Sequence, residues 1–139
     1  MKKKIGFLFL TMLICCTSNA QSNSNKKKKY KVIKTVNQWK KELSPMAFYV
    51  LREAGTERAF SSPLNNNKEK GIYVCAGCKT PLYESKYKYD SGSGWPSFDR
   101  GIKENIELDV DYKIGYERTE LKCKTCGGHL GHSFDDGPQ

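Results

Sequence analysis

The sequence contains no apolar run long enough to cross a membrane as a helix. Its main apolar run extends over ten residues, from Ile5 to Ile14, whereas a membrane-spanning helix needs about 20. The run follows Lys2 to Lys4 and precedes a small-x-small triplet at 18–20, an arrangement typical of a secretory signal peptide. Residues 1–20 are therefore predicted to be a signal peptide that is cleaved before Gln21.

Cys16 leaves the form of the exported protein open. A cysteine just after an apolar segment can carry a lipid, although Leu13, Ile14 and Cys15 ahead of it lack the small side chains usual for that modification. Simple export, a lipoprotein anchored at Cys16 and a retained anchor are the three alternatives. Each of them places the mature protein outside the cytoplasm, in the periplasm or the cell envelope.

Acidic residues are absent from positions 1–34, which hold nine of the 24 basic residues. Positions 35–139 contain 15 basic and 15 acidic residues, so the formal net charge of +9 comes entirely from the leader. A nucleic-acid-binding domain would carry its basic residues on the folded part. The charge distribution argues against nucleic acid as a partner and predicts a solvated Lys/Ser/Asn-rich linker over 21–42, ending in a short helix.

Cysteine is absent after position 20 except in two CxxC pairs, Cys75 with Cys78 and Cys123 with Cys126. Four thiolates in two such pairs are typical of a tetrahedral structural zinc site, in which each pair supplies two ligands from one tight turn. The 44 residues between the pairs exceed the roughly 15–20 of a compact zinc ribbon, so one zinc would join two distant parts of a larger domain. Two disulfides, which an oxidising compartment would favour, and a redox-active CxxC are the alternatives.

Apolar residues at helical spacing predict a short helix over 35–43. Ser44 followed by Pro45 provides an N-cap and a first-turn proline for a second helix over 46–54, stopped by Gly55.

The chain after residue 71 has the pattern of antiparallel β-structure. Apolar and charged residues alternate over 106–114, as in a half-buried strand, and 116–122 would form the return strand. Each CxxC then follows a strand. We expect a mainly β (α+β) fold in which short N-terminal helices precede a zinc-clamped β-domain.

Two loops have residues suited to chemistry. A glycine-rich loop presents Trp95, and glycines let a backbone approach a ligand closely; a buried structural tryptophan is the alternative. His129 and His132 are the only histidines, and two imidazoles this close can hydrogen-bond or protonate a small polar ligand near neutral pH. A purely structural pair, or metal binding with Asp135 or Asp136, are the alternatives.

Four segments in this order resemble the zinc-binding form of the methionine-R-sulfoxide reductase (MsrB) family. They are ERAF at 57–60, GIYVCAGC at 71–78, KYDSGSGWPSF at 88–98 and RTELKCKTCGGHLGHSFDDGP at 118–138. The resemblance covers 43–139. It implies two antiparallel sheets joined by a four-cysteine zinc site, and thiol-dependent reduction of the R epimer of methionine sulfoxide, repairing oxidised exported proteins.

The resemblance also implies roles for individual residues. Trp95 would form an apolar pocket for the methionine S-methyl group, and Phe134 would line the same pocket. His129 and His132 would border the sulfoxide oxygen as proton donors. The implied partners are methionine-sulfoxide-containing proteins or peptides and a thioredoxin-like dithiol reductant, and we expect a monomer.

The family's nucleophilic cysteine lies in an RYC-type segment beyond DDGP, and this chain ends at Gln139. Ser93 stands where a resolving cysteine often lies. We therefore expect the domain over 43–139 to be C-terminally incomplete and the catalytic nucleophile to be absent from this chain. The alternatives are an inactive zinc-stabilised module that binds oxidised methionine without turnover, and a zinc-free CxxC oxidoreductase.

Overall fold

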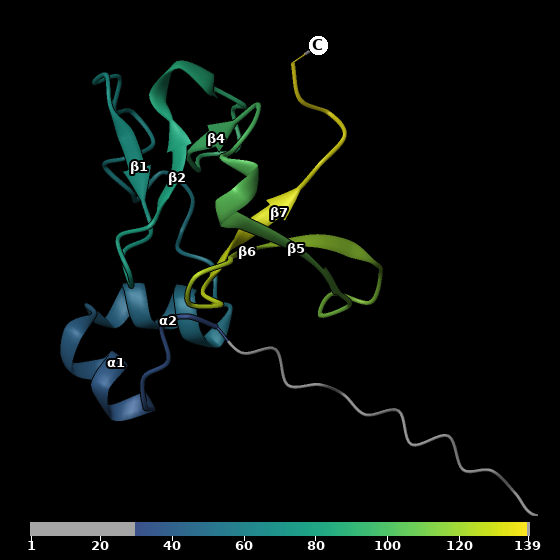
Figure 1. Cartoon of the computed structure of the whole chain (residues 1–139). Coiled ribbons are helices and arrows are strands. Elements are labelled where there is room, and N and C mark those ends of the chain that lie inside the picture. Colours follow the sequence, from purple (N-terminus) through teal and green to yellow (C-terminus); the bar gives the residue numbers. More distant parts are fainter. Residues whose placement is uncertain (1–29, 139) are drawn as a thin grey trace, which may run out of the picture.

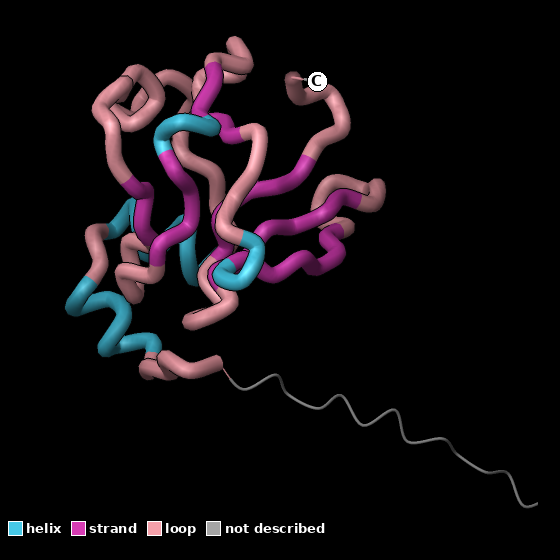
Figure 2. Tube along the Cα trace, turned by 45° about the horizontal axis from the view of Figure 1, so that its top comes forward, coloured by secondary structure: helices cyan, strands magenta, loops and turns pink. Residues whose placement is uncertain are grey.

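A computed structural model describes residues 30–138 and contains two short helices followed by short strands (Figure 1, Figure 2). The predicted signal peptide, Cys16 and the start of the linker lie outside these residues. No helix within 30–138 combines the length and the apolar character needed to cross a membrane. The helices are α1 (Val36–Glu42) and α2 (Pro45–Glu53); the strands are β1 (Ile72–Val74), β2 (Pro81–Glu84), β3 (Lys88–Tyr89), β4 (Ser97–Phe98), β5 (Ile106–Asp111), β6 (Arg118–Cys123) and β7 (His129–Ser133); two 3-10 turns are η1 (Ser85–Tyr87) and η2 (Lys103–Asn105).

Both predicted helices are confirmed, and side-chain caps set where they begin. Thr35 and Gln38 form a capping box at the start of α1. The Ser44 hydroxyl accepts a hydrogen bond from the Ala47 N–H at the start of α2, where Pro45 occupies the first turn. Helix α2 ends at Glu53, and Ala54, which has a left-handed backbone (φ 50°), caps it.

The strands form three small antiparallel sheets within the described residues. β1 pairs with β2, β3 pairs with β4, and β5, β6 and β7 form a three-stranded sheet in that order. The mainly β fold class is as expected, with three small sheets where the resemblance implied two. In Figure 1 the helices lie at one end of the molecule, and the β1–β2 hairpin and the β5–β7 sheet extend from them in different directions.

The core forms where the helices meet the two cysteine turns. Its buried members are Trp39, Leu43, Phe48, Leu51, Cys75, Leu82, Cys123 and Cys126. A Cβ on Gly77 would lie 3.4 Å from a methyl of Leu51, and a Cβ on Gly128 would lie 3.0 Å from its other methyl. Leu51 of α2 therefore packs against glycines of both turns, at a separation that leaves little room for side chains.

The hairpin of β5 and β6 differs from the expected half-buried arrangement. The predicted strand over 106–114 ends at Asp111, and its apolar residues beyond Ile106 face solvent: Leu108 is 67% and Val110 53% exposed. On the opposite face, the side chains of Asp111 and Arg118 are only 11% and 18% exposed. The alternation was predicted correctly, but at the end of β5 it is the polar face that is partly buried, whereas Asp109 on the same face is 49% exposed.

Candidate functional site: a four-cysteine cluster beside a buried imidazole–carboxylate network

The two CxxC turns have the same local backbone. The Lys79 N–H donates to the Cys75 carbonyl at 2.8 Å, and the Gly127 N–H donates to the Cys123 carbonyl at 2.7 Å. Lys79 (φ 62°) and Gly127 (φ 70°) occupy equivalent left-handed positions one residue after the second cysteine of each pair. Each turn thus directs two sulfurs toward a common centre.

The four sulfurs form a cluster suited to a metal ion. Cys75, Cys78, Cys123 and Cys126 are free cysteines whose sulfurs lie within 4.8 Å of one another. The Cys75–Cys126 and Cys78–Cys123 sulfur distances are 3.7 and 3.5 Å. Metal–sulfur bonds of about 2.3 Å in a tetrahedron imply sulfur–sulfur separations of about 3.8 Å, whereas a disulfide requires about 2.05 Å. The geometry fits four metal ligands and differs from the disulfide alternative.

Electrostatics in the cluster lead to the same conclusion. A hydrogen bond from Cys126 lowers the pKa of Cys75 to about 5, and this contact with burial raises the pKa of Cys126. Burial also raises the pKa of Cys123. Without a cation, the Cys75 thiolate therefore opposes ionisation of Cys123 and Cys126; a divalent cation would favour the thiolate form of both.

A second cluster lies on the buried polar face of the β5–β6–β7 sheet. The His129 Nδ1 lies 2.6 Å from Glu120 Oε1, and the His132 Nε2 lies 2.8 Å from Asp111 Oδ2. Arg118 pairs with the same Asp111 oxygen. The two imidazole centroids are 5.2 Å apart. Both predicted histidines therefore come together, each contacted by a partly buried carboxylate.

Asp111 is held in its charged form. The Lys113 N–H donates to Oδ1 at 2.7 Å, while His132 and Arg118 contact Oδ2. These contacts, with the Lys113 N–H the largest, lower the pKa of Asp111 to about 2. A carboxylate ionised throughout the neutral range accepts hydrogen bonds and cannot donate them.

The predicted aromatic residues occupy different places. The Trp95 indole is 38% exposed, and its Nε1–H donates to the Glu57 carbonyl at 2.9 Å. Phe134 is 66% exposed, with its ring centroid 6.5 Å from that of His132. Within residues 30–138, no hydrogen bond or ring contact joins Trp95 to the histidines. The structure therefore unites three of the four predicted pocket residues and leaves Trp95 separately anchored.

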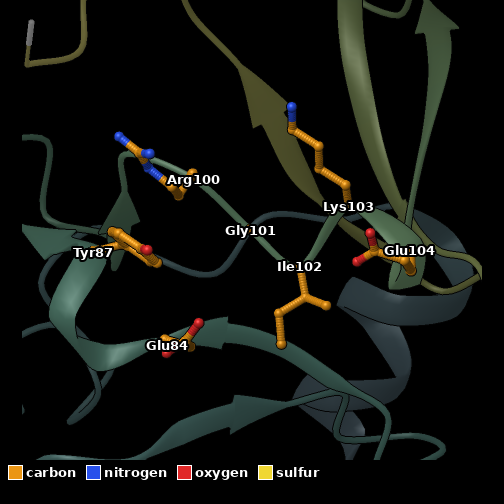
Figure 3. A pocket seen from close by; sticks show the side chains of 7 residues that line it. All are labelled: Glu84, Tyr87, Arg100, Gly101, Ile102, Lys103 and Glu104. Atoms are coloured by element: carbon orange, nitrogen blue, oxygen red, sulfur yellow. The ribbon is translucent and has the colours of Figure 1, made fainter.

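A cavity of about 290 Å³ elsewhere on the molecule contains none of the predicted site residues (Figure 3). Two of its charged groups are paired: Arg100 stacks on Tyr87 at 4.8 Å and forms an ion pair with Asp99, and Glu84 forms one with Lys86. Lys103 and Glu104 also line it. Because it holds no histidine or cysteine, the imidazole network is the better candidate site for proton transfer.

The sequence reasoning missed the acidic and basic members of the network, Asp111, Arg118 and Glu120. A signal was present, because Arg118 and Glu120 alternate with Thr119 and Leu121 in the strand opposite β5 and so share one face. The alternation alone does not determine which face of the strand is buried, and charged side chains are ordinarily expected on the solvent-exposed face.

Comparison with known proteins identifies the family. A SelR domain matches residues 43–139. The chain is 50% identical over 111 residues to the peptide methionine sulfoxide reductase MsrB of Leptospira interrogans, covering 79% of this chain and 85% of that protein. It is 50% identical over 109 residues to MsrB of Bradyrhizobium diazoefficiens, covering 78% of each. The chain belongs to the MsrB family.

A mouse relative extends the comparison. The mitochondrial methionine-R-sulfoxide reductase B3 is 46% identical over 114 residues, which cover 81% of this chain and 45% of the mouse protein. The SelR match of this MsrB-family chain includes α2, both cysteine turns, the Trp95 loop and β7. The family resemblance drawn from the sequence motifs is confirmed.

Proposed function

We propose that this MsrB-family protein serves the thiol-dependent reduction of the R epimer of methionine sulfoxide, in peptides and proteins, to methionine. The observation that carries the proposal is the 50% identity to peptide methionine sulfoxide reductases across most of the chain. The name of the mouse relative specifies the R epimer. Two imidazoles on a buried polar face are consistent with a site for a strongly hydrogen-bonding sulfoxide oxygen.

The chemistry requires a nucleophile, a proton and a reductant. A thiol and a sulfoxide give a sulfide and a sulfenic acid: the sulfoxide sulfur is reduced, its S–O bond breaks, and the thiol sulfur is oxidised. A second thiol condenses with the sulfenic acid to a disulfide and releases water. An external dithiol of the thioredoxin type then reduces the disulfide by exchange.

The residues present are suited to holding the substrate. His129 and His132 would contact the sulfoxide oxygen and supply its proton. Phe134 lies beside His132, and Trp95 would contribute the apolar surface for the S-methyl group after a shift of either loop. Gly92 in the Trp95 loop and Gly131 in β7 have positive φ and no neighbouring atom within 4 Å of an added Cβ, so each segment has one unpacked glycine at which it can adjust.

The four clustered cysteines are proposed to be structural ligands of one zinc ion, without a part in turnover. Their sulfurs converge on one another, and three of the four cysteines are buried. The remaining positions of 30–138 contain no cysteine. We accordingly propose that the nucleophile is not among residues 30–138.

The exported location is also a proposal, supported by the basic, apolar and small-x-small pattern of residues 1–20. Cell fractionation with mass spectrometry of the mature N-terminus tests it. Export predicts a chain that begins near Gln21, or a lipid on Cys16; recovery of the intact leader in the cytoplasm would reject export.

The substrate proposal is tested by binding and turnover with one peptide in three forms. The zinc-loaded 139-residue chain is titrated with the peptide carrying methionine, its R sulfoxide or its S sulfoxide. Differential hydrogen bonding and fit of the methyl group should favour the R form by about tenfold or more. Trp95→Ala should reduce this preference, while Tyr112→Ala, an exposed aromatic on the β5–β6 hairpin, should not. Equal binding of all three peptides rejects the proposal.

Turnover tests the proposed absence of a nucleophile from residues 30–138. Incubation of the 139-residue chain with excess dithiol and the R peptide, followed by mass spectrometry, measures methionine formed. Binding without turnover is expected of this chain both as a reductase lacking its nucleophile and as an inactive module that recognises oxidised methionine; methionine formation would contradict the assignment of all four cysteines as structural ligands. Reading the gene beyond codon 139 in all three frames for an RYC-type segment separates the reductase from the inactive module.

A further inference from the structure

The β5–β6–β7 sheet keeps four charged or titratable side chains largely out of solvent and exposes much of its apolar face. The side chains of Asp111, Glu120, His129 and His132 are 11%, 14%, 7% and 11% exposed. Removing such groups from water is costly unless each finds a partner. Leu108 and Val110 on the other face remain exposed, so this burial does not serve apolar packing. Buried titratable groups with specific partners are typical of functional sites.

The two carboxylates contact different nitrogens of the two imidazole rings. Glu120 contacts Nδ1 of His129, and Asp111 contacts Nε2 of His132. An ionised carboxylate only accepts hydrogen bonds, so each contacted nitrogen carries the hydrogen. In the neutral rings this fixes the tautomer, and the bare nitrogens are Nε2 of His129 and Nδ1 of His132.

The bare nitrogens remain reachable. Within the described residues, no hydrogen bond occupies Nε2 of His129 or Nδ1 of His132, and neither atom belongs to the fully buried side-chain atoms without a partner. Each atom therefore keeps at least a small solvent contact. Their rings belong to one strand and lie 5.2 Å apart, close enough to contact the same oxygen from two sides.

We infer that Glu120 and Asp111 are positioning residues of the proposed reductase site: each fixes one imidazole so that a defined nitrogen, Nε2 of His129 and Nδ1 of His132, faces the sulfoxide oxygen. This inference rests on the proposed function. Arg118 of β6 helps to hold Asp111 in place, because its guanidinium forms an ion pair with that carboxylate.

The arrangement keeps proton transfer at a single atom of each ring. A ring that takes up a proton at its bare nitrogen becomes a cation whose charge the carboxylate balances. It can donate that proton to the sulfoxide oxygen as the thiol adds to sulfur, and it returns to the same neutral tautomer. The proton that the thiol loses recharges the ring, so the step consumes no net proton and yields sulfide and sulfenic acid. Neither ring has to rotate.

The experiment uses nitrogen NMR of the imidazoles, because the chain has only two histidines and therefore four ring nitrogens. Two-bond proton–nitrogen spectra of the zinc-loaded, tag-free 139-residue chain distinguish protonated from bare nitrogens. We expect the Nδ1–H form for His129 and the Nε2–H form for His132. The His129 form is the diagnostic one, since an unrestrained histidine favours Nε2–H.

Variants of Glu120 test whether its carboxylate determines the tautomer of His129. Glu120→Ala should convert His129 to the Nε2–H form, while Glu120→Gln should retain Nδ1–H because the amide oxygen still accepts a hydrogen bond. Glu117→Ala removes an exposed acid of the same hairpin and should change neither ring. Metal content and thermal unfolding verify that each variant is folded. A His129 that keeps its tautomer in folded Glu120→Ala would overturn the inference.

Addition of the R-sulfoxide peptide completes the test. Signals of the two bare nitrogens should shift and those of the carboxylate-bound nitrogens should move less, with little effect from the S epimer. If the R peptide binds and the bare nitrogens do not respond, the inference is wrong while the proposed function stands. If the wild-type chain binds no sulfoxide peptide although the tautomers are as expected, the proposed function fails, and the substrate-facing role with it.

Discussion

Arg118 shows how individual contacts hold the polar face together. Its Nη2 pairs with Asp111, and its Nε is buried without a partner within the described residues. Asp111 in turn accepts from the Lys113 N–H and from His132. Since the pKa of Asp111 is about 2, the ion pair is intact at neutral pH. The stability that the ionised form provides is present above pH of about 4 and is lost as the pH falls toward 2.

Removing the charge of Asp111 alone should lower stability by nearly as much as removing the charges of both Asp111 and Arg118. Asp111→Asn leaves the Arg118 charge poorly compensated, and we expect a lower free energy of unfolding at pH 7. Adding Arg118→Gln should lower it little further, so that a double-mutant cycle measured by urea unfolding shows coupling between the two sites. Glu84→Gln in the exposed Lys86 pair should change stability by less than about 0.5 kcal/mol. Additive effects of the two substitutions would contradict this account.

At the scale of elements, the caps and the cysteine turns could be predicted because their determinants are local. Ser44 with Pro45 fixes the start of α2, and each CxxC supplies its own turn. The orientation of the β5–β6 hairpin could not be predicted, because alternation assigns residues to two faces and leaves open which face is covered. The network that includes Glu120 follows from that orientation. Trp95 could be singled out, but its Glu57 anchor depends on a loop 38 residues away.

The two faces of this architecture should respond differently to truncation of leucine. Leu51 of α2 is 7% exposed and packs between the two cysteine turns, so Leu51→Ala should lower the free energy of unfolding by about 3 kcal/mol. Leu108 of β5 is 67% exposed, and Leu108→Ala should change it by no more than about 0.5 kcal/mol. Denaturant unfolding of both variants measures the difference. Similar losses at the two sites would mean that Leu108 is covered in solution.

At the scale of the whole molecule, the cysteine cluster brings together a turn that follows β1 and a turn that follows β6. Cys75 follows the β1–β2 pair's first strand, Cys123 ends β6, and helix α2 contacts the second turn through a hydrogen bond of 3.0 Å from Arg52 to the Cys126 carbonyl. The three small sheets are separate. Because an isolated pair of short strands is marginal alone, we expect the cluster to contribute to holding β7 and its histidines in place.

Loss of the metal should therefore disorganise the fold as a unit. We expect about one zinc per chain, with four thiols protected from thiol reagents until a strong chelator is added. Chelation, or Cys126→Ser, should lower the midpoint of thermal unfolding by on the order of 10 °C or more, because the free energy of metal binding contributes directly to folding. Ser91→Ala, which removes a hydroxyl from the exposed loop before Trp95, is the matched control and should leave metal content unchanged. The two imidazole tautomers should also be lost on chelation, since β7 begins at the second turn. A chain purified with zinc present that holds no metal, or one whose unfolding is indifferent to chelation, would show that the four sulfurs are not the element that holds these sheets together.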